Sequence, residues 1–176
     1  QKYIEDPFSK LLPSDSEDKV ALEIGCGLGF HTELLSKRFK KVISIDLTNY
    51  SCQVTKKRIF LKNIHNVDVI CCSATKIPIK ANSVDFVWSW GVIHHIPDAD
   101  KVISEIERVL SEKGSFWGMF YNKISFYNWL NVYLRYGLLK LEIFKLNTIE
   151  LSSKYSDGKS FGGNPYTVFY SQKELN

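Results

Sequence analysis

The residues best suited to chemistry lie in the stretch 21–31, "ALEIGCGLGFH", which reads as an apolar run ending in a glycine-rich turn. Three glycines at alternate positions follow Glu23, namely Gly25, Gly27 and Gly29. Because glycine has no Cβ, such a turn lets the backbone approach a ligand closely. The candidate ligands are a dinucleotide, a nucleoside triphosphate or another molecule that carries adenosine.

Two common phosphate-binding patterns do not fit this turn. The dinucleotide fingerprint G-x-G-x-x-G needs a third glycine where this chain has Phe30 in one register and Thr32 in the other. A P-loop needs a lysine directly after its last glycine, and no lysine follows here. A nicotinamide oxidoreductase is therefore disfavoured, and the third class of ligand remains.

Short apolar runs alternate with stretches of helical periodicity up to residue 121. The expected strands are 19–24, 41–46, 67–72, 84–90 and 113–121. The expected helices are 29–38, about 50–62 with Asn49 or Ser51 as its cap, and 98–111 with Asp98 as its cap. Strands that alternate with helices pair in parallel, so we predict an α/β fold with a doubly wound, mainly parallel sheet.

The segment after residue 121 has a different character. Residues 125–146 are helical and apolar on most sides, with a break expected at Gly137, and 166–171 is one further strand candidate. We expect a single domain over 1–176, in which 1–18 is a lead-in, 19–121 binds the cofactor and 122–176 is a helical, aromatic segment on the substrate side. Its aromatic residues either cover an acceptor or pack in the core or in a dimer interface. A helix lying on a membrane surface is disfavoured, because the charges of this segment are few and scattered.

Composition narrows the class of protein. A net charge of +4 is too small to imply nucleic acid as a partner, and the basic clusters read as solvated helix faces. The four cysteines contain no C-x-x-C pair, which predicts reduced, mostly buried thiols, no metal site and a cytoplasmic protein. The most apolar stretch, 126–146, is interrupted by charged residues and is not expected to span a membrane.

With these elements in place, the chain resembles the class I S-adenosylmethionine-dependent methyltransferases. The resemblance rests on "LEIGCGLG", on Asp46 seventeen residues after Gly29, on "SATKIPIKANSVDFVWSWGVIHHIPD" and on "EIERVLSEKGSF". It covers about 19–121 and extends to one bacterial branch of the type 11 methyltransferases, for which no substrate is defined. It implies a Rossmann-like sheet of order 3-2-1-4-5. The family's final antiparallel hairpin is incomplete or missing here, so we expect a truncated chain.

The resemblance also implies which residues bind S-adenosyl-L-methionine. The glycines and Cys26 would lie against the cofactor, Glu23 would hold the loop amides and, through water, the cofactor's ammonium group, and Asp46 would accept hydrogen bonds from both ribose hydroxyls. Leu47 would flank the adenine. Ser73 replaces the family's usual Asp, which weakens the expected bond to the adenine amino group. The remaining implied contacts are the Ala74 amide, Trp90 and Gly91, although Trp90 is also a candidate core residue.

His94 and His95 are the candidates for a catalytic base, and Trp90 is a third candidate catalytic residue. Adjacent histidines on one element point apart, so we expect one to pack in the core with its nitrogens satisfied and the other to face the substrate. The "NPY" at 164–166 resembles the Asn/Asp-Pro-Pro-Tyr/Phe motif of enzymes that methylate amino groups. It lacks one proline and lies far from the fourth strand, so it does not carry that function.

We therefore predict methyl transfer from S-adenosyl-L-methionine to a small-molecule acceptor by in-line displacement. The alternative is a non-catalytic module that binds the same cofactor and engages a partner protein through residues 122–146. Nucleic acid is disfavoured as a partner, and assembly into a homo-oligomer is left open.

Overall fold

The computed structural model of the protein describes residues 8–126, 128–156 and 163–175. The chain forms two compact units. The first unit contains Gln1–Ser89 and Asp100–Gly118, and the second contains Trp90–Ala99 and Met119–Asn176.

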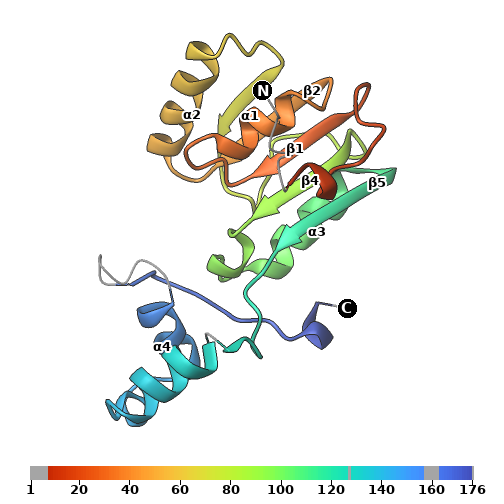
Figure 1. Ribbon diagram of the computed structural model, residues 1–176. Coiled ribbons are helices and arrows are strands. Elements are labelled where there is room, and N and C mark those ends of the chain that lie inside the picture. Colours follow the sequence, from red (N-terminus) through yellow and green to blue (C-terminus); the bar gives the residue numbers. More distant parts are fainter. Residues whose placement is uncertain (1–7, 127, 157–162, 176) are drawn as a thin grey trace. The chain divides into compact units, whose positions relative to one another are not determined.

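A five-stranded sheet is the centre of the first unit (Figure 1). Its strands are β1 (Val20–Ile24), β2 (Lys41–Asp46), β3 (Val67–Cys71), β4 (Val84–Trp90) and β5 (Leu110–Met119). The order is β3-β2-β1-β4-β5, and β1 pairs in parallel with both β2 and β4, as β2 does with β3. The doubly wound Rossmann-like sheet and its predicted order are confirmed.

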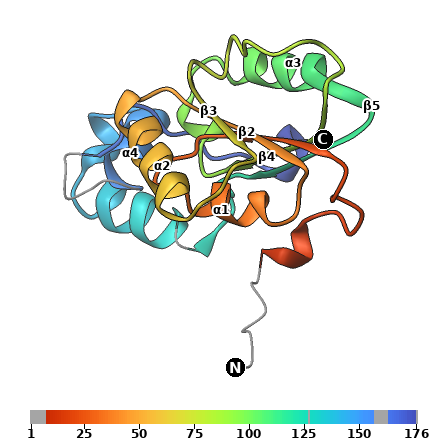
Figure 2. The same cartoon turned by 90° about the horizontal axis from the view of Figure 1, so that it is seen from above.

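Helices flank this sheet on both sides. They are α1 (Phe30–Ser36), α2 (Asn49–Leu61) and α3 (Ala99–Val109), and α1 and α3 lie on opposite faces of the sheet (Figure 2). The central strands β1 and β4 have nearly continuous buried runs, because both of their faces are covered. Trp88 of β4 is fully buried and stacks on Trp117 of β5 with ring centroids 4.5 Å apart. The apolar strand patterns therefore account for this core.

Several element boundaries differ from the predictions. The cap of α2 is Thr48, whose side chain accepts a hydrogen bond from the Ser51 amide, rather than Asn49 or Ser51 itself. The strand β5 begins at Leu110 rather than at 113, so Ser111, expected at the end of a helix, lies within the strand. The helix α3 ends at Val109, two residues earlier than predicted, and Val109 O accepts a hydrogen bond from the Ser83 amide at 2.9 Å.

The second unit is mainly helical. Its elements are the 3₁₀-helices η2 (Ile93–His95), η4 (Glu142–Phe144) and η6 (Gln172–Glu174), the π-helix η3 (Asn128–Leu138) and the α-helix α4 (Thr148–Tyr155). The first unit adds one more 3₁₀-helix, η1 (Ser9–Leu11). The helices η3 and α4 pack through a core of Val132, Tyr136, Leu151 and Tyr155.

The strand predicted at 166–171 is wrong. Within this segment Tyr170 forms an isolated parallel bridge with Asn122, while the Val168 amide donates to His94 O at 2.9 Å. A strand needs a continuous ladder of hydrogen bonds to one neighbour, and single bonds to separate loops do not supply one. The predicted break of the helix near Gly137 fits the end of η3 at Leu138.

The four cysteines are free thiols. Cys26 and Cys52 are buried, Cys72 is half-buried and Cys71 is exposed at the end of β3, so the expectation of mostly buried thiols holds for two of the four. In the part of the chain that the structure describes, no helix combines the length and the apolar character needed to cross a membrane.

Candidate functional site

The glycine-rich turn after β1 has a left-handed backbone at each of its three glycines. The φ angles are 83° at Gly25, 50° at Gly27 and 78° at Gly29. Residues with a Cβ rarely adopt these values, which explains the glycines physically. The amides of Gly25 and Cys26 both donate to Ile45 O, at 2.8 and 3.1 Å, so the turn is tied to the end of β2.

Gly27 and Gly29 differ in what surrounds them. A Cβ built on Gly27 would meet nothing within 4 Å, so the backbone there borders open space that a ligand can enter. A Cβ on Gly29 would lie 3.1 Å from Thr55 Oγ1 and from Arg58 Cδ of α2. Gly27 therefore has the space of a ligand cradle, whereas Gly29 allows α2 to pack closely against the turn.

Asp46 at the end of β2 points toward this turn. Its Oδ2 accepts a hydrogen bond from the Gly27 amide at 3.1 Å. Its Oδ1 accepts two more, from the amide and the hydroxyl of Thr48, both at 2.9 Å. A carboxylate has about four acceptor positions and three are used here, so Asp46 keeps one for a hydroxyl group of a ligand. The carboxylate is thus fixed in place beside the open backbone at Gly27.

Glu23 is fully buried in β1, and its partners differ from the prediction. Its Oε2 accepts hydrogen bonds from the hydroxyls of Thr32 and Ser44, at 2.5 and 2.6 Å, and not from the amides of the glycine turn. The amides bond to Ile45 O and Asp46 instead. Burial raises the pKa of Glu23 to about 7, against the opposing effect of the two hydroxyls. A cofactor contact of Glu23 stays a prediction.

Three further residues predicted to contact the cofactor surround the ends of β2 and β3. Leu47 is 74% exposed, Ala74 is buried, and the Ser73 hydroxyl lies 2.8 Å from Thr75 Oγ1 while accepting from the Thr75 amide. The Cys72 amide donates to Asp46 O at 2.9 Å, which brings the start of this loop to the end of β2. Their positions suit the expected adenine contacts, which stay predictions.

The other predicted site residues belong to the second unit. Trp90 is the last residue of β4, and Gly91 follows it with a φ of 71°. A Cβ on Gly91 would lie 3.3 Å from Met119 Cε, so this glycine permits close packing within its unit. Their roles toward the cofactor, and that of Trp90 as a catalytic residue, stay predictions.

The two histidines do not point apart as predicted. Both lie in η2, where a tight turn replaces the expected regular element, and their ring centroids are 4.2 Å apart. His94 is fully buried, and neither of its ring nitrogens makes a hydrogen bond of good geometry within the described residues. Burial and the neighbouring His95 lower the pKa of His94 to about 4, with a smaller opposing effect from the Met119 backbone. The expected satisfied core histidine is thus buried but unsatisfied.

His95 is half-buried and held by the segment that contains "NPY". Its Nδ1 lies 3.0 Å from Tyr166 O and 3.1 Å from Thr167 Oγ1. A backbone carbonyl only accepts, so Nδ1 of a neutral ring carries the proton and Nε2 carries the lone pair. This contact gives "NPY" a structural role that its sequence did not indicate.

Sequence reasoning missed the hydroxyl residues that support the site. Thr48 holds Asp46, the Thr55 hydroxyl donates to Gly27 O at 3.2 Å, and Thr32 and Ser44 hold Glu23. Thr48 was detectable, because a threonine directly before a helical stretch is a typical N-cap. The other contacts join separate elements and have no local signal. Among the described residues, no group of three or more His, Cys, Asp or Glu side chains is arranged to hold a metal ion.

Comparison with known proteins settles the family. A family model described as a methyltransferase domain matches residues 22–118, which contain the glycine turn, Asp46 and the whole of β4. The chain belongs to this family. Membership in the type 11 methyltransferases, predicted from the motifs, is confirmed, and S-adenosyl-L-methionine is the cofactor of this family.

Individual methyltransferases show the same extent of similarity. A malonyl-[acyl-carrier protein] O-methyltransferase of Methylovorus is 31% identical over 102 residues, which are 54% of this chain and 34% of that protein. A probable S-adenosylmethionine-dependent methyltransferase of Mycolicibacterium smegmatis is 30% identical over 105 residues, covering 60% of this chain and 39% of the relative. The chain thus matches between a third and two fifths of the length of these curated relatives.

A solved structure agrees with the fold. A SAM-dependent methyltransferase from Aquifex aeolicus matches with a TM-score of 0.62 and 25% identity, over 68% of this chain and 70% of that one.

Proposed function

We propose that this protein transfers a methyl group from S-adenosyl-L-methionine to a small-molecule acceptor. The observation that carries the proposal is the Asp46 carboxylate, bonded to the Gly27 amide beside backbone that no side chain covers. The family membership supports the cofactor, whereas the acceptor is inferred only as a class.

The residues of the first unit fit the expected cofactor. The remaining acceptor position of Asp46 suits one ribose hydroxyl, and a bond to the second hydroxyl would replace the bond from the Thr48 hydroxyl. The open space at Gly27 leaves room for the part of the ligand next to the sugar. Exposed Leu47 offers an apolar surface for the adenine. Gly25, Cys26 and Gly29 shape the turn, and Ser73 and Ala74 complete the adenine side.

The bound cofactor would supply an electrophilic methyl group on a sulfonium. The chain's own residues then need mainly to hold two reactants in line, and positioning of this kind contributes on the order of 7–11 kcal/mol. Asp46 is suited to that task because Gly27 and Thr48 fix its carboxylate.

His95 is our candidate for the proton acceptor, in preference to His94. Its Nδ1 is bonded to Tyr166 O, which leaves the Nε2 lone pair to take a proton from the group that receives the methyl. His94 is fully buried and its pKa is lowered to about 4, so it is a poor base. A general base contributes about 10²–10⁴-fold where the acceptor needs deprotonation.

The experiment that tests the cofactor site is a titration with S-adenosylmethionine, S-adenosylhomocysteine and NAD, followed by thermal stability. A ligand present at 100 times its dissociation constant stabilises the folded protein by about 2.7 kcal/mol. We expect Asp46→Ala to weaken S-adenosylmethionine binding about 10- to 100-fold, since hydrogen bonds to a charged group contribute about 1.5–3 kcal/mol.

The matched control is Asp68→Ala. Asp68 is an exposed acid of the neighbouring strand β3 that pairs with Lys41 at 2.8 Å, and its removal should leave the affinity unchanged. Stabilisation by NAD alone would refute the proposal. An unchanged affinity in Asp46→Ala would refute the ribose assignment, and cofactor binding without methyl transfer would favour a binding module instead.

A further inference from the structure

An exposed apolar segment lies in the second unit between η3 and α4. Within the seven residues 138–144, five large apolar side chains are exposed, and Leu139 and Phe144 are 71% and 78% exposed. The five are Leu138, Leu139, Leu141, Ile143 and Phe144. We call residues 138–144 the apolar turn. Scattered exposed apolar residues are ordinary, but a contiguous group of this kind marks an interaction surface.

The apolar turn is distinct from the core of its unit. Val132, Tyr136, Leu151 and Tyr155 already fill the space between η3 and α4, and each is at least nine-tenths buried. Leu141 has a left-handed backbone with φ 58° and is the N-cap residue of η4. The exposed side chains of the apolar turn are therefore not part of the core that holds η3 and α4 together.

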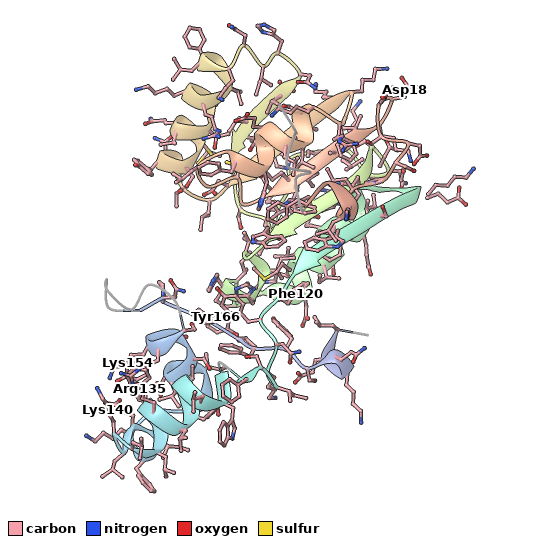
Figure 3. The ribbon with its side chains drawn as sticks, in the orientation of Figure 1. Asp18, Phe120, Arg135, Lys140, Lys154 and Tyr166 are labelled. Atoms are coloured by element: carbon pink, nitrogen blue, oxygen red, sulfur yellow. The ribbon has the colours of Figure 1, made fainter. Side chains whose placement is uncertain are left out.

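Three cations gather around the tyrosine pair next to this turn (Figure 3). Tyr136 and Tyr155 stack with ring centroids 4.2 Å apart and an interplanar angle of 5°. The charged ends of Arg135 and Lys140 lie 5.5 and 5.1 Å from the centroid of Tyr136, and Lys154 Nζ lies 5.1 Å from that of Tyr155. Residues distant in the sequence thus form one cationic cluster.

The charge around the apolar turn is positive overall. Exposed Lys145 adds a fourth cation, and the carboxylates of the same stretch are Glu142 and Glu150. Glu142 pairs with Lys154 at 3.0 Å, and Glu150 closes the cap of α4 with Asn147. Arg135, Lys140 and Lys145 therefore leave an excess of positive charge beside exposed leucine, isoleucine and phenylalanine side chains.

We propose that this face docks on the surface of an anionic phospholipid bilayer. The cations would lie against lipid phosphates while Leu139, Leu141 and Phe144 enter the boundary between headgroups and acyl chains. A second copy of the chain fits less well, because a two-fold contact through the same patch would bring each cationic cluster against its symmetry mate. The inference is independent of the proposed methyl transfer.

The test is flotation of the purified protein with vesicles of two compositions. One contains phosphatidylcholine alone, and in the other about a third of the lipid is phosphatidylglycerol, so that only the second carries surface charge. We expect the protein to float with the anionic vesicles and to be released as salt is raised, because screening shortens the reach of surface charge.

Variants separate the two components of the surface. Lys140→Ala should weaken partitioning about fivefold, the value of one cation near an anionic surface. Phe144→Ser should weaken it about tenfold or more, because a large apolar side chain no longer enters the bilayer. The matched controls are Lys57→Ala and Phe60→Ser on α2, which are exposed to a similar degree and should partition as the parent does.

Three results would overturn the docking. The first is equal binding to both vesicle types, or none to either. The second is a dimer in sedimentation that Phe144→Ser abolishes, which would assign the turn to a protein contact. The third is stabilisation by inorganic phosphate together with no flotation, which would reduce the cluster to a site for free anions.

Discussion

Substitution of Glu23 by glutamine tests whether a buried carboxyl destabilises the protein at neutral pH. The Glu23 side chain is 1% exposed, and burial raises its pKa from 4.5 to about 7. The folded state therefore holds a proton that the unfolded state releases between these values. Stability falls as pH rises through this window, because the unfolded state binds fewer protons than the folded state.

The magnitude follows from the two pKa values. A difference of about 2.5 units at about 1.36 kcal/mol per unit corresponds to a loss of stability of about 3 kcal/mol, absent below pH 4.5 and fully present above pH 7. A glutamine at this position would keep an oxygen that can accept from Thr32 and Ser44, but it does not ionise. The free energy of unfolding of Glu23→Gln, relative to that of the parent, should therefore rise by about 3 kcal/mol as the pH is raised from below 4.5 to above 7.

The assay is urea unfolding of both proteins at several pH values, followed by circular dichroism. The matched control is Glu107→Gln on the exposed side of α3, for which the difference from the parent should not vary in this way. A difference for Glu23→Gln that stays constant across the range would refute the reasoning. It would mean that the two hydroxyls hold Glu23 ionised despite its burial.

Two further predictions concern the histidine pair and the glycine turn. Burial and His95 lower the pKa of His94 to about 4, so the folding stability of the parent falls as pH drops below about 6.5, where the unfolded state binds the proton first. In the same urea series, the stability of His94→Phe relative to the parent should therefore rise by about 3 kcal/mol between neutral pH and pH 4. A difference that does not change with pH would contradict a buried neutral ring. Gly29→Ala should destabilise the protein by more than the roughly 1–2 kcal/mol of a left-handed alanine, since its Cβ meets Thr55 and Arg58. Gly27→Ala should destabilise it by only about that amount but should weaken S-adenosylmethionine binding, because the space beside Gly27 is open. Equal stability losses together with equal affinities would contradict the difference in the surroundings of the two glycines.

Local sequence patterns were sufficient for the sheet and for the glycine turn. The apolar runs that became β1, β2 and β4 are buried on both faces, so each is nearly uninterrupted in the sequence. The glycines were readable because a left-handed backbone selects them regardless of distant contacts. The role predicted for Asp46 came from the resemblance to the methyltransferases, and the structure places this residue at the end of β2.

Contacts between distant segments were not readable from the sequence. The partners of Glu23 come from α1 and β2, and the bond between His95 and Tyr166 O spans 71 positions. The strand expected at 166–171 failed for the same reason, since alternating apolar residues also suit a segment that bonds to two separate loops. The cationic cluster around Tyr136 and Tyr155 arises only once η3 and α4 pack together.

Thr48 links the start of α2 to the orientation of the Asp46 carboxylate, since one hydroxyl serves both. The conformational entropy lost on fixing the Asp46 carboxylate is therefore already lost when the first turn of α2 folds. A nucleoside that binds afterwards finds carboxylate oxygens already held in place. Association then loses little conformational freedom on the protein side, so the resulting affinity reflects the contacts themselves. Substitutions that loosen the beginning of α2 should consequently weaken the affinity for the nucleoside even when they lie outside its contact surface.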